Sequence, residues 1–134
     1  MSAIFTTRSV VENLLQTLNI PLALENAEFT PVADQPYLIV QYLIQDPEDP
    51  VWGDKYYRER IQLQVFVCDV LNQGVGSAIT TAELIRALFH KGWSATSGVY
   101  RISSFNTPKI AGCTKTSDRL VVPCLIDLIT EVNL

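Results

Sequence analysis

Apolar residues recur at every second position in several parts of the chain, which is the period of a half-buried β-strand. The four stretches with this pattern are residues 37–45, 56–69, 99–105 and 119–132. The second alternates most regularly, with one face formed by Ile61, Leu63, Val65 and Val67. A short extended piece at 22–25 precedes them. Pro123 cannot donate a ladder hydrogen bond, so we expect the last strand to lie at a sheet edge there or to carry a bulge.

Two other stretches repeat their apolar residues with the period of an α-helix. In residues 7–18 the apolar stripe is formed by Val10, Val11, Leu14, Leu15 and Leu18. Thr6 or Thr7 would cap this helix, and the segment 19–21 would end it. The second helix is predicted from Ser77, as its N-cap, to Lys91, with Gly92 as its stop. Its buried side would consist of Ala78, Ile79, Ala82, Ile85, Leu88 and Phe89.

The predicted order is helix, short strand, strand, strand, helix, strand, strand. This order is typical of an α+β domain in which two helices pack on one face of an antiparallel sheet of about four to five strands. A length of 134 residues suits a single domain spanning 1–134 with its own core.

Several apolar residues fall on the sheet face away from that core. They are Ile39, Leu43, Val121, Leu125 and Ile129. A lone domain has little use for apolar side chains there, whereas an oligomer does. We therefore expect Ile39 and Leu43 to take part in a subunit interface.

Two long loops are the other candidate contact regions. The stretch DPEDPVWGDK, residues 46–55, is stiffened by two prolines and carries Trp52, and exposed loop tryptophans are common interface anchors. Asp49, Asp54 and Lys55 flank Trp52 as further candidates. The second loop, NTPKIAGCTKTSD, adds Lys109 and Lys115.

Composition narrows the possible functions. Charged residues make up 18% of the chain and the net charge is −4, which argues against a basic nucleic-acid footprint. An acidic surface suits a conduit through which DNA slides without binding. No apolar run is long enough for a membrane helix, and no export signal is expected. Three widely spaced cysteines fit reduced thiols in a cytosol, and we expect Cys68 and Cys124 to be packed within strands.

Catalytic groups are scarce. His90 is the single histidine, and we expect it in the last turn of the second helix, where its cation suits the helix dipole. A reactive thiolate at Cys113, near Lys115, is the less favoured alternative to an inert thiol. The glycines Gly74 and Gly76 lack the rest of a phosphate-loop motif, so a turn before a helix is the simpler interpretation. We expect no catalytic, metal or cofactor site, and no enzyme.

Three segments together resemble the tail terminator, or tail-completion, proteins of long-tailed bacteriophages and prophages. The first is IPLALENAEFTPVADQPYLIVQYLI, in which Glu25-Asn26 and Phe29-x-Pro31 are the distinctive residues. The second is YYRERIQLQVFVCDVLNQGVGSAITTAELIRALF, and the third is the terminal strand RLVVPCLIDLIT. They extend from residue 20 to residue 130.

The resemblance implies a structural protein of the virion tail, assembled in the bacterial host cytoplasm. Such subunits close into a homo-oligomeric ring, usually a hexamer, on the last ring of the tail tube. The ring stops tube polymerisation and offers its other face to the head–tail connector, while genomic DNA passes through the lumen. No membrane partner and no cofactor is implied.

Two alternatives remain open. One is another head–tail joining protein, which would bind the connector rather than the tube. The other is a small α+β ligand-binding domain or enzyme that uses Cys113 or the glycine turn, which a closed apolar pocket with a perturbed titratable group would favour.

Overall fold

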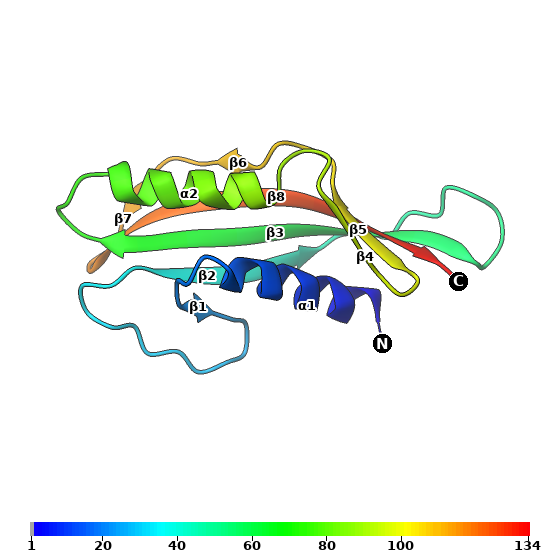
Figure 1. Ribbon diagram of the computed structural model, residues 1–134, viewed down its shortest axis with the longest axis horizontal. Helices are drawn as coiled ribbons and strands as arrows, with labels where there is room; N and C mark the ends of the chain where they lie inside the picture. The colour runs from blue at the N-terminus through cyan, green and yellow to red at the C-terminus, as the bar shows by residue number, and fades with distance from the viewer. Residues whose placement is uncertain (1) are drawn as a thin grey trace.

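A computed structural model describes residues 2–134 (Figure 1). The elements, in chain order, are α1 (Ala3–Gln16), β1 (Leu22–Ala23), β2 (Tyr37–Ile44), β3 (Tyr56–Val70), α2 (Gly76–Leu88), β4 (Ser94–Ser97), β5 (Tyr100–Ser104), β6 (Lys109–Ile110), β7 (Thr114–Lys115) and β8 (Arg119–Asn133). The strands form one sheet in the order β1-β2-β3-β8-β5-β4, and β6 and β7 also pair with β8.

The α+β class is confirmed, but the expectation of a purely antiparallel sheet of four to five strands was wrong. The sheet has eight strands and is mixed, because β1 runs parallel to β2. The predicted loop 106–118 contains β6 and β7, and β4 was not predicted. Two-residue strands are too short to show a period of two, and the sequence SATS of β4 contains no apolar alternation.

The two longest strands form the centre of the sheet. β3 and β8 are each 15 residues long and pair antiparallel along their whole length, from Tyr56 opposite Asn133 to Val70 opposite Arg119. The alternating residues of β3 that sequence placed on the core face are buried, including Leu63 and Val65. This pair is the rigid platform on which the other elements are placed.

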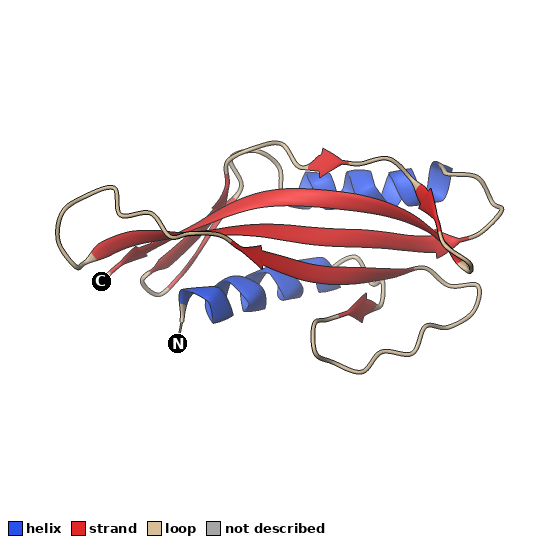
Figure 2. Ribbon diagram, turned by 180° about the vertical axis from the view of Figure 1, so that it is seen from behind, coloured by secondary structure: helices blue, strands red, loops and turns tan. Residues whose placement is uncertain are grey.

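Both helices cover the same face of the sheet (Figures 1 and 2). Val11 and Leu15 of α1 and Ala82 and Ile85 of α2 are fully buried in one cluster with the inner residues of β2, β3, β5 and β8. The rest of the predicted stripe of α1 is partly buried against this cluster. Figure 2 shows the opposite face, which neither helix covers.

The first helix begins earlier than predicted. Ser2, not Thr6 or Thr7, is the N-cap, and its hydroxyl accepts a hydrogen bond of 3.0 Å from Phe5 N. Both threonines are buried within the helix, where Thr7 Oγ1 donates to Ala3 O and lies 2.6 Å from Thr130 Oγ1. Hydroxyls satisfied in this way do not interrupt a helix, so a threonine at its start was a misleading signal.

The second helix also differs at both ends. Val75 occupies the N-cap without a side-chain hydrogen bond, so the prediction of Ser77 as the cap was wrong. The helix ends at Leu88 because Phe89 turns its buried ring into the core, and Ser104 Oγ donates to Phe89 O across 3.0 Å. His90 therefore lies beyond the helix rather than in its last turn, and its Nδ1 is 3.1 Å from Lys91 O.

Pro123 lies in a central strand whose register with β3 is unbroken, so the expectation of a sheet edge or a bulge was wrong. Its carbonyl accepts a hydrogen bond of 2.9 Å from Ala111 N, on the side of β8 away from β3. The N and O atoms of one strand residue point to the same side, so the absent N–H faces the short β6 segment and not β3. β3 and β8 therefore stay paired past the proline.

Within residues 2–134, no helix is both long enough and apolar enough to cross a membrane.

Candidate interaction surfaces

The uncovered side of β2, β3 and β8 forms one continuous surface, which we call the open face (Figure 2). Its apolar half is set by the strand register, which places Tyr37, Cys68 and Val121 in one row and Ile39, Phe66 and Pro123 in the next. Most of these side chains are half-buried. The prediction that Ile39, Val121, Leu125 and Ile129 lie on the face opposite the core is confirmed, and Leu43 on the same face is 50% exposed.

The other half of the open face is polar. Gln64 Nε2 donates to Gln62 Oε1 across 3.0 Å, and Gln62 Nε2 donates to Asp127 Oδ1 across 3.3 Å. Asn106 Nδ2 donates to the second oxygen of Asp127, again at 3.3 Å. Because these groups satisfy one another, this half of the face is organised before any partner binds.

The loop between β2 and β3, residues 45–55, projects beyond the end of the sheet near the C-terminus (Figure 1). Its base is fixed by paired backbone hydrogen bonds of 2.8 and 2.9 Å between Glu48 and Arg58 and by Leu134 N, which donates to Lys55 O at 2.7 Å. Arg60 Nε lies 3.3 Å from Glu48 Oε1. Trp52 is fully exposed at the tip, as predicted. Asp49, Asp54 and Lys55 are exposed beside it.

The two lysines of the second predicted loop lie elsewhere. Lys109 is exposed on β6, opposite Leu125, and Lys115 is exposed on β7, opposite Leu120. The register of β3 and β8 places Lys115 near Asp69, whereas the loop carrying Trp52 leaves the sheet beyond Arg58. The structure therefore places the loop with Trp52 and Lys115 at opposite ends of the sheet, with Ile39, Leu43 and Lys109 between them.

Arg119 is a functional candidate that sequence reasoning missed. It is 6% exposed at the start of β8, and its guanidinium donates to Val32 O at 2.9 Å and to Gln35 O. The same group lies 5.0 Å from the centroid of the Tyr37 ring, which is 5.1 Å from that of Phe29. Arg119 thus fastens the segment 24–36, which contains the distinctive Phe29-x-Pro31 motif, to the central strand. The sequence did contain a signal for this role, because Arg119 stands at the start of a strand that is otherwise mostly apolar.

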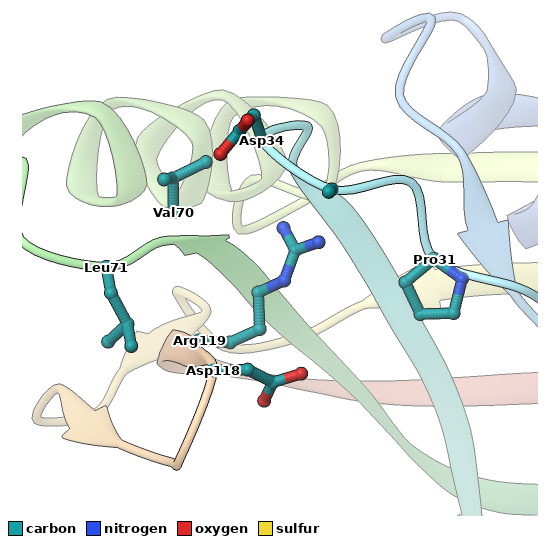
Figure 3. A pocket seen from close by; sticks show the side chains of 7 residues that line it. Pro31, Asp34, Val70, Leu71, Asp118 and Arg119 are labelled. Atoms are coloured by element: carbon teal, nitrogen blue, oxygen red, sulfur yellow. The ribbon is translucent and has the colours of Figure 1, made fainter.

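Beside Arg119 lies an open cavity of about 530 Å³ (Figure 3). Asp34 comes from the 24–36 segment, Val70 and Leu71 from the end of β3, and Asp118 from the turn before β8. The carboxylates and the guanidinium project from different elements, and Arg119 points toward the backbone of the 24–36 segment (Figure 3). The arrangement holds the 24–36 segment against the start of β8.

The prediction that Cys68 and Cys124 are packed within strands is confirmed. Cys113 is exposed, whereas Cys68 and Cys124 are buried. Burial raises the pKa of the Cys124 thiol to about 11 and also raises the pKa of Cys68, so both stay protonated at neutral pH. In the part of the chain that the structure describes, no three His, Cys, Asp or Glu side chains are grouped closely enough to hold a metal ion.

The sequence matches a family model over residues 6–127, a span that contains β2, β3, α2 and most of α1 and β8. That model describes the phage tail terminator protein. The chain belongs to the phage tail terminator family. The match includes the open face, the loop with Trp52 and the segment held by Arg119, so these surfaces belong to a structural protein of the phage tail.

A solved structure, one of the chains that match, has the same fold. It superposes with a TM-score of 0.64, covering 96% of this chain and 94% of that chain at 22% sequence identity. At this identity the likeness shows the fold alone. No curated protein matches the sequence.

Proposed function

We propose that the protein closes into a ring, expected to be a hexamer, on the end of the tail tube. The ring stops tube polymerisation and presents its other side to the head–tail connector. The observation that carries this proposal is the family match over residues 6–127. The protein would take its place at the head-proximal end of the virion tail, after synthesis in the host cytoplasm.

The distribution of contact surfaces supports a ring. A ring of identical subunits needs heterologous contacts, in which one patch meets a different patch on the neighbouring subunit. Trp52 and its acidic neighbours lie at one end of the sheet, and Lys115 lies at the other. Separated, chemically different patches suit head-to-tail association better than a two-fold dimer, in which one patch meets itself.

The charge of the molecule supports a lumen through which DNA slides. The net charge is −4, with 14 acidic and 10 basic residues. A ring of such subunits repels the phosphate backbone and does not hold the genome in place. DNA would be a passing occupant and not a sequence-specific partner.

The test combines mass measurement in solution with negative-stain imaging of the protein alone and with purified tail tubes. We expect rings, either free or seated on tube ends, and tubes that stop growing when the protein is added to polymerising tube protein. A protein that stays monomeric and never associates with tube ends would contradict the proposal. Binding to the connector but not to tubes would instead identify another head–tail joining protein.

A further inference from the structure

An apolar hollow lies between α1 and the edge strand β4, on the side of the sheet that carries the helices. It has a volume of about 370 Å³ and is lined by Val10, Asn13, Leu14, Thr17, Trp93 and Ala95. Its apolar walls belong to side chains that pack against the core with one side left accessible: Val10, Leu14 and Trp93 are all partly buried in this way. The hollow is therefore backed by rigid structure.

The rim of the hollow offers hydrogen-bond acceptors. Asn13 and Thr17 are exposed there, and the hydroxyl of Thr17 donates to Leu14 O, which leaves its oxygen free to accept. β4, which contributes Ala95 to the lining, pairs with β5 on one side and is the last strand of the sheet on the other, so its outer row of backbone groups has no partner strand. A ligand that is apolar with a single N–H donor fits this arrangement.

Trp52 has these properties. Its indole is a large apolar group with one donor and no acceptor. It is fully exposed, so it does not occupy the hollow of its own chain. The hollow falls within the range of pockets that hold small organic groups, roughly 300–1,000 Å³. Within it, Trp93 offers an aromatic partner whose ring already packs edge-on against Phe89, with centroids 5.2 Å apart.

Charges on the two surfaces are complementary. The loop 45–55 carries four acidic residues and one lysine. Lys91 is exposed two residues before Trp93, in a turn closed by the hydrogen bond from Trp93 N to His90 O. Opposite charges around an apolar anchor favour the correct docking orientation.

We propose that Trp52 of one subunit inserts into the hollow between α1 and β4 of the next subunit, with its acidic loop beside Lys91. The contact joins two different patches, so it repeats from subunit to subunit, and it forms a closed ring when the rotation between neighbours divides a full turn. This inference rests on the proposed ring and specifies the contact that holds it together.

The test is cross-linking between single cysteines. In a Cys113→Ser background, whose remaining native thiols are buried, Val51→Cys, which leaves Trp52 in place, is combined with Asn13→Cys at the rim of the hollow. A short bis-maleimide should then convert the assembled protein, alone or on tail tubes, into a ladder of covalent oligomers up to the full ring. Either cysteine alone should give at most dimers. Val51→Cys with Ser77→Cys, an exposed position at the start of α2, is the matched control and should give no ladder.

Blocking the hollow gives a second measurement. Asn13→Trp places a bulky ring at the rim and should raise the dissociation constant of the ring at least tenfold with an unchanged melting temperature. Gln16→Trp is exposed on the same helix but does not line the hollow, so it should leave assembly unchanged.

The outcomes separate this inference from the proposed function. Intact rings with no ladder, or with full tolerance of Asn13→Trp, would overturn the inference and leave the ring function standing. Cross-linking of the cysteine introduced at position 51 to the tube protein would also overturn it, because the tip of the loop would then contact the tube. Failure to form rings with or without tubes would contradict the proposed function itself.

Discussion

Tyr42 joins α1 to the sheet through its hydroxyl and its ring. The hydroxyl donates to Glu12 Oε2 at 2.8 Å, and the guanidinium carbon of Arg8 lies 4.6 Å from the ring centroid. Arg8 Nη2 also lies 3.4 Å from Glu25 Oε1, so the same cluster reaches the segment after β1. Burial and, after it, the hydrogen bond to Glu12 raise the pKa of Tyr42 well above its ordinary value near 10, because both disfavour the phenolate.

The raised pKa of Tyr42 predicts alkaline destabilisation. A tyrosine of the unfolded chain loses its proton near pH 10, whereas Tyr42 in the folded protein stays protonated, so stability is full below pH 10 and falls above it. Between pH 10 and 11, we expect the free energy of unfolding of the wild type to fall by up to about 1 kcal/mol more than that of Tyr42→Phe. At pH 7 the variant should be about 1 kcal/mol less stable, because it loses a hydrogen bond to a carboxylate. Urea unfolding at pH 7, 10 and 11 measures both effects. If the stability of the two proteins fell equally from pH 10 to pH 11, the raised pKa of Tyr42 would be contradicted.

The exposures of the three thiols predict their order of reaction. At pH 8 a thiol reagent should modify Cys113 in the folded protein and reach Cys68 and Cys124 only after unfolding, because burial keeps both protonated and inaccessible. Mass spectrometry after timed labelling counts the modified sites. Cys113→Ser should remove the fast reaction entirely, and a fast reaction that persisted would show that a buried thiol is accessible.

At the scale of elements, the 24–36 segment is held against the sheet by its attachment to β8. Residues 24–36 form no strand, and two of them, Asn26 and Asp34, have positive φ angles of 55° and 63°. Short polar residues tolerate this conformation better than other side chains do. The two carbonyl contacts of the segment with Arg119 replace the ladder that a strand would have provided. The part of the segment from Val32 to Gln35 therefore depends on Arg119 for its position.

Arg119→Met should release this segment while preserving the sheet. The substitution keeps a long apolar stem but removes the donors to Val32 O and Gln35 O, so we expect a loss of about 1–2 kcal/mol of stability. Amide exchange over residues 30–36 should speed at least tenfold, with exchange in β3 nearly unchanged. Arg101→Met, at an exposed position on β5, is the matched control. Equal exchange in both variants would show that Arg119 does not hold the segment.

At the scale of the whole molecule, the exposed tip of the 45–55 loop can be changed without affecting the stability of the fold, so its role in assembly can be measured separately. Trp52 contributes nothing to the core. Trp52→Ala should therefore change the free energy of unfolding by only about 0.5 kcal/mol or less. If the ring is held as proposed, the same variant should assemble at least tenfold more weakly, which analytical ultracentrifugation measures. Val51→Ala, next to it and also exposed, should assemble normally. A large fall in the melting temperature of Trp52→Ala would contradict this prediction, because it would show that Trp52 packs in the core.

Much of this architecture follows from the sequence. The period of two in residues 56–69 and 119–132 identifies the two central strands, because long strands that bury one face must alternate. The helical stripe beginning at Val10 identifies α1 in the same way. The exposure of Trp52 also follows, since a loop with two prolines and four acidic residues has no apolar face to pack.

Other features were settled only by contacts between distant segments. The two-residue strands β6 and β7 form because they pair with β8, and no local sequence pattern predicts them. The helix end at Leu88 depends on Phe89 and Ser104 meeting across 15 residues. The hollow between α1 and β4 and the attachment made by Arg119 likewise join segments far apart in the chain. Periodicity in the sequence thus determined which residues face the core, whereas tertiary packing decided which surfaces remain open to a partner.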